Sequence, residues 1–218
     1  MDFVVSRASA ASEELEQACS AHGVDLFSLD ADTYDKLADA QTPQPAFAVV
    51  HAPSLDIDQR FEASGSLYLV LVDVGDPGNV GTLIRTAEAA GCRGVIVTST
   101  TADVLSPKVV RSSAGSILRM PIGEVDVREL PSVLKRLGTI TVATAMDGEP
   151  FTDLALEVTQ SVAILLGSEA HGLDPMVAAH ADKTVAIPMH GKVESLNVAV
   201  AGAILLYGIG VDTCEGSL

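Results

Sequence analysis

The sequence predicts an α/β protein in which helices cover both faces of a parallel sheet, preceded by a small α/β domain. Apolar segments of strand length alternate with helical segments from residue 67 onward, which is the pattern of parallel sheets. The first of these strands, LYLVLVDV at 67–74, is apolar without interruption, as expected for a strand buried on both faces. Hydrophobic residues make up 48% and charged residues 19% of the 218 residues, a balance that excludes a disordered chain.

Residues 1–62 are predicted to hold the small domain and a connector. The segment QTPQP separates a helix from a strand, because proline neither continues a helix nor donates to a sheet ladder. The polar segment APSLDIDQRFEASGS then leads to the larger domain, predicted over 63–218. Within the small domain we expect helices at 12–22 and 30–40 and strands at 24–29 and 46–51.

In the larger domain, the turn GDPGN after the first strand leads into a helix over VGTLIRTAEAAG that ends at Gly91. A second helix is predicted over 106–115, with Ser106 as its N-cap and Pro107 in its first position. The last helix is apolar but too short to span a membrane, which favours burial in the core or in a dimer interface. The other strands are expected at 93–100, 117–123, 139–146, 162–167 and 184–189, and the other helices at 129–138 and 196–210.

The charges are distributed unevenly. The net charge of −16 by itself disfavours nucleic-acid binding, because phosphate contacts need Lys and Arg. Residues 85–136, however, carry eight of the thirteen Lys and Arg residues against five acids. This stretch is either the docking surface of a polyanion or a set of ordinary solvated helix faces, and charge alone leaves both open. The candidate RNA-binding residues in it are Arg85, Lys108, Arg111 and Arg119.

The sequence lacks the motifs of several other protein classes. No apolar run reaches the roughly 18 residues of a membrane span, and the opening MDFVVSRASAASEELEQ lacks the features of a targeting signal, so we expect a cytoplasmic protein. Three widely spaced cysteines and scattered histidines predict neither a disulfide framework nor a metal site. Gly75, Gly78 and Gly81 follow the spacing G-x-x-G-x-x-G, which disfavours a nucleotide-dependent oxidoreductase with its G-x-G-x-x-G loop.

Three segments place polar residues within apolar surroundings at the C-terminal ends of predicted strands, where open α/β sheets bind ligands. These segments are 79–91, 164–173 and 187–206. Taken singly, each polar residue also has a structural explanation, such as a helix N-cap for Ser195 or a surface charge for Arg85. The polar residues concerned are Asn79, Arg85, Glu169, Ser195 and Asn197.

Together these segments resemble the three motifs of the SpoU, or TrmH-type, family of RNA ribose 2′-O-methyltransferases, within the SPOUT class. The segment SPKVVRSSAGSILRMPI also resembles the family between its motifs, and the resemblance covers about residues 67–210. The matched residues are Asn79, Gly81 and Arg85 in the first motif (N-x-G-x-x-x-R), Gly167, Ser168, Glu169 and Gly172 in the second (G-S-E-x-x-G), and Ile187, Pro188, Met189, Ser195, Leu196 and Asn197 in the third (I-P-M…S-L-N).

The resemblance implies a trefoil knot in the C-terminal part of the domain, S-adenosyl-methionine bound in a bent shape, and a homodimer. A knot does not follow from periodicity, because knotted connections are rare. The role implied for Gly167 makes physical sense, because a backbone without a Cβ can approach the adenosine closely. The cofactor-binding residues implied by the family are Thr144, Ala145, Leu166, Gly167, Ser168, Ile187, Met189, Ser195 and Leu196.

The implied reaction is in-line attack of a ribose 2′-oxygen on the sulfonium methyl group, without a metal. Because a 2′-hydroxyl is a very weak acid, positioning of the reactants and electrostatic stabilisation of the alkoxide supply most of the rate acceleration. Arg85 matches the family's catalytic arginine, but a guanidinium is effectively never deprotonated. We therefore expect Arg85 to bind the adjacent phosphate and stabilise the alkoxide, while a phosphate oxygen or water takes the proton. The residues expected to orient Arg85 and the nucleotide are Asn79, Glu169, Ser195 and Asn197.

Residues 20–52 resemble, more weakly, the end of the small ribosomal-protein-like RNA-binding domain that many family members carry. The helix and strand that open that domain are not expected here, which predicts a shortened RNA-binding domain over 1–62. Such a domain favours ribosomal RNA over transfer RNA as the substrate. The alternative is a noncatalytic RNA-binding or ribosome-assembly protein with the knotted fold, which the intact motif residues argue against.

Overall fold

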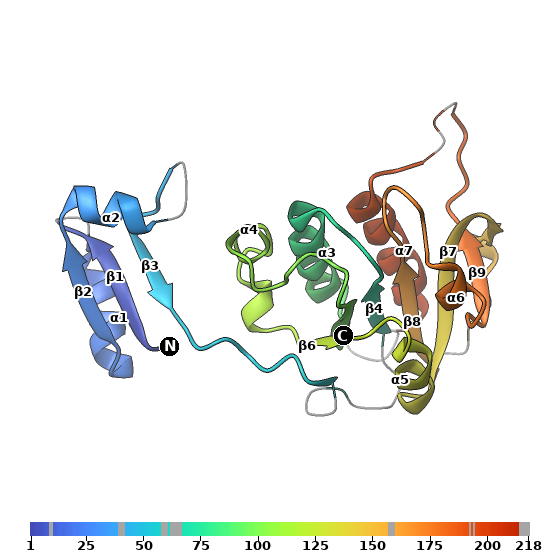
Figure 1. The fold of residues 1–218 in the computed structure, drawn as a ribbon, viewed down its shortest axis with the longest axis horizontal. Helices are drawn as coiled ribbons and strands as arrows, with labels where there is room; N and C mark the ends of the chain where they lie inside the picture. The colour runs from blue at the N-terminus through green and yellow to red at the C-terminus, as the bar shows by residue number, and fades with distance from the viewer. Residues whose placement is uncertain are drawn as a thin grey trace. The chain divides into compact units, whose positions relative to one another are not determined.

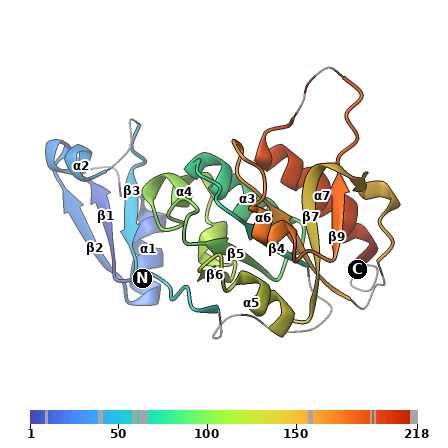
Figure 2. The same ribbon diagram turned by 45° about the vertical axis from the view of Figure 1, so that its right-hand side comes forward.

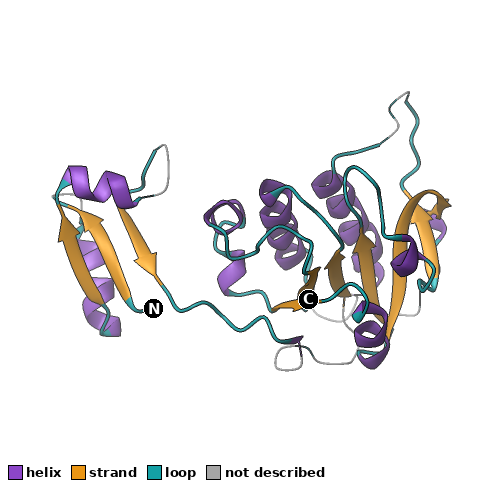
Figure 3. Ribbon diagram, in the orientation of Figure 1, coloured by secondary structure: helices purple, strands orange, loops and turns teal. Residues whose placement is uncertain are grey.

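The computed structural model describes residues 1–8, 11–38, 42–57, 61, 67–156, 160–191, 193 and 195–213. The chain forms two compact units, Met1–Pro53 and Ser54–Leu218, each built around its own sheet (Figures 1 and 3). The predicted boundary between residues 62 and 63 lies outside the described residues.

The described part of the first unit comprises β1 (Phe3–Arg7), α1 (Glu13–His22), β2 (Asp25–Leu29), α2 (Ala31–Leu37) and β3 (Ala46–Val49). Its strands follow the order β2-β1-β3, with β1 parallel to β2 and antiparallel to β3. Tyr34 of α2 anchors the core, because its ring lies 5.4 Å from that of Phe47 and its hydroxyl donates to the Gln44 carbonyl at 2.7 Å. Burial raises the pKa of this hydroxyl above its usual value.

The prediction that no strand precedes the first helix is wrong. FVVSR forms β1, the central strand of the small sheet, and Val4 and Val5 on it are both buried. Successive buried residues lack the strict alternation that identifies a half-exposed strand, and five residues are too few for a periodicity to stand out. The small unit therefore has a strand that the sequence pattern did not indicate.

The described part of the second unit comprises β4 (Leu67–Leu71), α3 (Pro77–Ala89), β5 (Gly94–Thr98), α4 (Pro107–Ser112), β6 (Ile122–Val125), α5 (Leu130–Arg136), β7 (Thr139–Pro150), β8 (Ser161–Leu166), α6 (Pro175–Ala178), β9 (Lys183–Ala186) and α7 (Val198–Thr213). Its strands are all parallel, in the order β6-β5-β4-β8-β7-β9. The predicted α/β class with a parallel sheet is thus confirmed.

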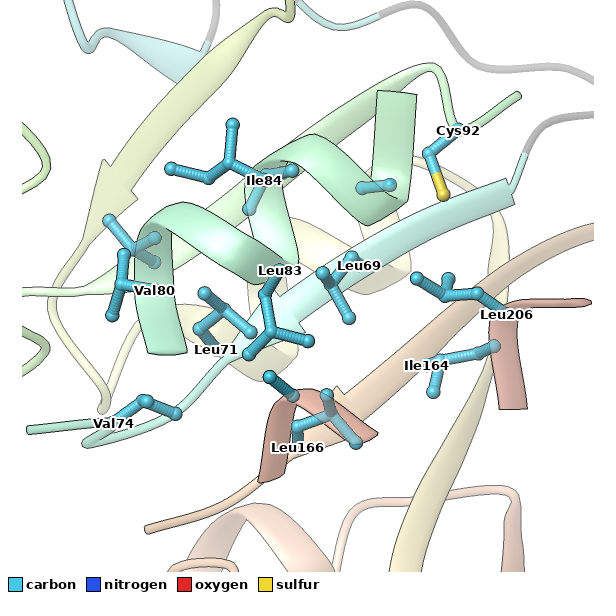
Figure 4. Close-up of a cluster of buried hydrophobic side chains, with 14 of the residues drawn as sticks. Leu69, Leu71, Val74, Val80, Leu83, Ile84, Cys92, Ile164, Leu166 and Leu206 are labelled. Atoms are coloured by element: carbon cyan, nitrogen blue, oxygen red, sulfur yellow. The ribbon is translucent and has the colours of Figure 1, made fainter. Parts of the chain in front are cut away.

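Helices cover both faces of this sheet, as predicted (Figure 2). Side chains from alternate positions of β4 divide between two cores. Leu69 and Leu71 pack on the side of α3 and α7, where Figure 4 shows them beside Leu83. Their neighbours Tyr68 and Val70 pack on the side of α5 and α6. Burial on both faces explains the uninterrupted apolar run that predicted this strand.

Several element boundaries differ from the prediction. The strand predicted at 117–123 begins at Ile122, because Gly115, with φ +88°, turns the chain into a short 3₁₀ helix at Ser116–Leu118. Pro121 has no N–H to donate, so it contributes only its carbonyl, which accepts from the Val95 N–H at 2.9 Å. The four-residue helix α6 was not predicted, and the last strand ends at Ala186 rather than at residue 189.

Part of the predicted polar connector belongs to the core of the second unit. The Leu55 carbonyl accepts from the Glu124 N–H at 2.9 Å, and Ile57 is 6% exposed. The Phe61 ring lies 5.8 Å from that of Tyr68. Gly94 and Gly123 leave room for these side chains, since a Cβ on either would lie under 2.5 Å from Phe61 or Ile57. Leu55, Ile57 and Phe61 of the connector therefore pack against the part of the sheet that contains β5 and β6.

The trefoil knot implied by the family resemblance stays a prediction.

Among the residues that the structure describes, no helix is long and apolar enough to cross a membrane.

Candidate active site

The first two predicted motifs start where the direction of the sheet's connections reverses. The chain runs from β4 to β5 and β6 on one side, whereas β8 lies against β4 on the other side. The carboxyl ends of β4 and β8 are joined by a hydrogen bond from the Val72 N–H to the Leu166 carbonyl at 2.9 Å. Such switch points are where open α/β sheets bind ligands. The first and second motifs, which follow β4 and β8, therefore lie side by side.

The N-terminus of α3 is held by Asp76, which is not among the site residues predicted from the sequence. Its Oδ1 accepts from the Asn79 N–H at 2.9 Å, and Pro77 occupies the first helical turn. An Asp-Pro pair at the start of a helix is a recognisable N-cap signal. The Asp side chain accepts from the first free amides of the helix, and Pro has no N–H that needs an acceptor. The cap places Asn79 in the first turn of α3, at the switch point.

Gly81 of the first motif lets α4 approach α3. A Cβ at this position would lie 1.9 Å from the Ser112 Oγ and 2.6 Å from the Val109 carbonyl oxygen. The requirement for glycine here is thus a helix–helix contact, and the contact fixes α4, which carries Lys108 and Arg111, beside the motif helix.

A relay of hydrogen bonds joins one residue from each motif. Asn197 Nδ2 donates to Asn79 Oδ1 at 3.1 Å, and Asn79 Nδ2 donates to Glu169 Oε1 at 2.8 Å. The Asn197 Oδ1 accepts from the Ala199 and Val200 N–H groups at 2.9 and 3.3 Å, so its amide nitrogen must face Asn79. This fixes the direction of every bond in the relay and requires Glu169 to act as an acceptor.

The relay corrects one structural explanation considered for the third motif. The cap of the last helix is Asn197 and not Ser195, because Asn197 accepts from the first amides of α7. The side chains of Ser195 and Arg85 are exposed and, within the described residues, form no hydrogen bond or ion pair. Arg85 lies about 9 Å further along α3 than Asn79, at about 1.5 Å per residue. Of the five predicted catalytic residues, the structure brings three into direct contact.

The predicted cofactor-binding residues belong to β7, to the end of β8 and to the segments that follow β8 and β9. The strand β7 departs from regular pairing with β9 between Thr144 and Glu149, so Ala145 lies in an irregular, exposed part of the strand. Thr144 Oγ1 donates to the Leu165 carbonyl at 3.0 Å, which ties the middle of β7 to β8. The apolar side chains of this region are buried at Leu166, half-buried at Ile187 and about one-third exposed at Met189 and Leu196.

Gly167 is required by a protein contact. A Cβ at this position would lie 2.2 Å from the Gly172 carbonyl carbon and 2.3 Å from the Leu173 nitrogen. The loop folds back on itself here, since the Gly172 N–H donates to the Ser168 carbonyl at 2.8 Å and the Ala170 N–H to Ser168 Oγ at 3.3 Å. The close approach of backbone to backbone shapes the loop that presents Glu169 to Asn79.

Two of the predicted RNA-binding cations already have acidic partners. Lys108 Nζ lies 3.3 Å from Asp76 Oδ2, and Arg119 forms two bonds to Glu88, at 2.5 and 2.9 Å. The bidentate guanidinium lowers the pKa of Glu88 to about 2, and Glu88 in turn raises the pKa of Arg119. Part of the positive charge counted in the sequence is therefore neutralised on the surface. Among the described residues, no three metal-ligating side chains cluster.

Comparisons with known proteins agree with this geometry. The chain is 34% identical over 186 residues to the 23S rRNA (guanosine(2553)-2′-O)-methyltransferase RlmP of Bacillus subtilis, covering 85% of this chain and 72% of RlmP. Its fold matches that of the SpoU methyltransferase AviRb from Streptomyces viridochromogenes with a TM-score of 0.86 and 28% identity over 99% of this chain and 83% of AviRb. An AdoMet-bound rRNA methyltransferase from Sinorhizobium meliloti matches with a TM-score of 0.81 and 27% identity, covering 95% of this chain and 78% of that one.

The family resemblance drawn from the three motifs is confirmed by a family model. The match spans residues 66–207, which includes the first motif, the second motif and the third. The chain belongs to the SpoU rRNA Methylase family.

Proposed function

We propose that the chain transfers a methyl group from S-adenosyl-methionine to a ribose 2′-hydroxyl of ribosomal RNA. Its relative RlmP is named as a 23S rRNA 2′-O-methyltransferase, and AviRb has been solved in complex with the cofactor AdoMet. The observation on this chain that carries the proposal is the Asn197–Asn79–Glu169 relay, which joins the three family motifs at the switch point of the sheet. The intact motif residues Arg85, Glu169, Ser195 and Asn197 argue against a noncatalytic role.

The predicted cofactor-binding residues fit the proposed cofactor. Adenosine has apolar faces and polar edges, and the region offers the partly exposed side chains of Ile187, Met189 and Leu196. The Thr144 hydroxyl donates its proton to the Leu165 carbonyl, whereas Ser168 Oγ accepts from the Ala170 N–H and keeps its own proton to donate to a ligand. When bound, S-adenosyl-methionine supplies an electrophilic methyl group.

The chain's own residues position the RNA and stabilise charge. Asn79 presents the Glu169 carboxylate in a fixed orientation through one oxygen, Oε1, which leaves Oε2 available to orient a donor of the nucleotide. The exposed Arg85 guanidinium binds the phosphate next to the target ribose and stabilises the negative charge that develops on the 2′-oxygen. The proton leaves the 2′-oxygen to a phosphate oxygen or to water, because the guanidinium stays protonated.

Transfer of labelled methyl groups tests the proposal. The full chain is incubated with labelled S-adenosyl-methionine and with ribosomal or transfer RNA that lacks modifications, and Arg85→Ala serves as the control. We expect label at a 2′-O position of ribosomal RNA with the unsubstituted chain and none with the variant. Label in transfer RNA alone would refute the substrate class. Cofactor binding without label in either RNA would favour the noncatalytic alternative.

The proposed assembly is a cytoplasmic homodimer that uses α7. Residues 198–211 of this helix carry no charged side chain, yet Val200 is 49% and Tyr207 52% exposed in the single chain. Exposed apolar side chains on an otherwise buried helix favour contact with a second copy. Sedimentation of the full chain tests this assembly, and a monomer at micromolar concentration would contradict it.

The Glu88–Arg119 pair predicts a gain of RNA affinity on removing an acid. With a pKa of about 2, Glu88 is ionised throughout any ordinary assay, and its contribution to the pair is lost only as the pH falls through about 2. Glu88→Gln frees the Arg119 guanidinium for phosphate, so we expect KM for RNA to fall a few-fold and its salt dependence to steepen. Glu129→Gln, which removes the same charge from the exposed start of α5, controls for net charge. An equal change in both variants would contradict the prediction.

A further inference from the structure

Asp76 connects two helices at the edge of the proposed active site. Its Oδ1 accepts from the Asn79 N–H at 2.9 Å, and its Oδ2 accepts from Lys108 Nζ at 3.3 Å. Because Lys108 belongs to the first turn of α4, one carboxylate ties the first turns of α3 and α4 together. Both side chains also lie over Gly78, where a Cβ would be 2.8 Å from Asp76 Oδ1 and 3.8 Å from Lys108 Cε.

The ion pair between Asp76 and Lys108 contributes little to the stability of the fold. The side chains of Lys108 and Asp76 are 60% and 50% exposed, and an ion pair in such surroundings adds at most a small amount to stability. Its position indicates a role in the site, because the amide that Asp76 caps belongs to Asn79. Asn79 is also the central residue of the relay, with Asn197 on one side and Glu169 on the other.

We propose that Asp76 and Lys108 are a pair of positioning residues for the methyl-transfer site. Asp76 fixes the first turn of α3 and with it the Asn79 side chain, and Lys108 acts by holding Asp76. Lys108 is therefore tied to the relay instead of serving as a direct phosphate contact, the role first expected for it. This inference rests on the active site proposed above.

Four variants of the full chain distinguish whether Lys108 holds Asp76 or binds a phosphate of the RNA. They are Asp76→Ala, Asp76→Asn, Lys108→Met and the double variant Asp76→Asn/Lys108→Met. Asn is as good an N-cap as Asp but carries no charge, so Asp76→Asn keeps the helix start and weakens only the pairing with Lys108. Asp126→Ala, which removes a carboxylate that accepts from the Arg128 N–H at 2.8 Å before α5, is the matched control.

We expect Asp76→Ala to lower kcat by about 10- to 100-fold, because a catalytic group misplaced by about 1 Å costs on that order. The dissociation constant for S-adenosyl-methionine should change less than about twofold, since Asp76 lies outside the predicted cofactor-binding residues. Asp76→Asn should retain most of the kcat that Asp76→Ala loses. Lys108→Met should lower kcat a few-fold alone and add nothing in the Asp76→Asn background, and Asp126→Ala should leave kcat unchanged.

Two results would overturn the inference. One is a rise in KM for RNA on Lys108→Met that has the same size in both backgrounds and weakens the salt dependence, which is the behaviour of a phosphate contact. The other is an unchanged kcat in Asp76→Ala. Hydrogen exchange of the Asn79 amide gives a readout independent of activity, with protection expected in the unsubstituted chain and in Asp76→Asn and lost in Asp76→Ala. If the unsubstituted chain methylates no RNA, the proposed function fails, while the exchange pattern still tests the positioning by Asp76.

Discussion

Arg85→Lys will be nearly as inactive as Arg85→Ala, although lysine keeps the positive charge. In the described structure the Arg85 side chain is exposed and tied to no other residue, so its geometry is set by the substrate it meets. A guanidinium offers a planar fork that matches a phosphate through two bonds, whereas an ammonium acts as a point charge. We expect kcat/KM to fall about 100- to 1,000-fold in both variants, the usual loss when one preorganised donor is removed from a developing oxyanion.

The comparison that decides this prediction is the ratio of the two variants, measured by single-turnover methyl transfer. Binding of S-adenosyl-methionine should be unchanged in both, because Arg85 is not among the predicted cofactor-binding residues. Near-normal turnover of Arg85→Lys would contradict the bidentate role and leave only a requirement for positive charge. Arg93→Lys, a substitution within the same basic stretch but outside the motifs, should retain full activity.

Local patterns were sufficient to predict most of the second unit. The uninterrupted apolar run of β4 follows from burial on both faces. The helix α3 ends at Ala89, two residues before Gly91 (φ +77°), where its end was predicted. The errors occur where a local pattern is short or has a nonlocal cause. The five residues of β1 give too brief a signal, and the start of β6 depends on how Pro121 pairs with Val95. The packing of Ile57 against Gly123 also joins a connector to a distant strand.

The motif residues were identifiable from the sequence, but their roles were not. Composition and spacing do not reveal that Asn197 caps α7 with its oxygen and so turns its nitrogen toward Asn79, 118 residues away. The same limit applies to Gly167, whose neighbour is the Gly172 backbone. Charge counting also overestimated the free positive charge, because it did not pair Arg119 with Glu88 across two helical segments. Each missing fact is a contact between parts of the chain that the fold alone brings together.

Gly167→Ala will cost both stability and cofactor affinity. The added Cβ would lie 2.2 Å from the Gly172 carbonyl carbon and 2.3 Å from the Leu173 nitrogen. Both neighbours are backbone atoms, so no side chain can rotate away, and the loop over 168–173 must move instead. Overpacking of this kind costs about 1–3 kcal/mol. Because the loop carries Ser168 and Glu169, the same movement disturbs a predicted cofactor contact and the relay.

We expect a melting temperature lower by several degrees and a dissociation constant for S-adenosyl-methionine raised on the order of tenfold, since 1.4 kcal/mol corresponds to a factor of ten. Calorimetry of the full chain measures both quantities. Gly191→Ala is the matched control, because a Cβ at that position meets nothing within 4 Å and its φ is not in the left-handed region. A Gly167→Ala chain with unchanged stability and affinity would mean that the loop adapts without cost. The backbone contact between Gly167 and Gly172 would then not be what requires a glycine at the start of the second motif.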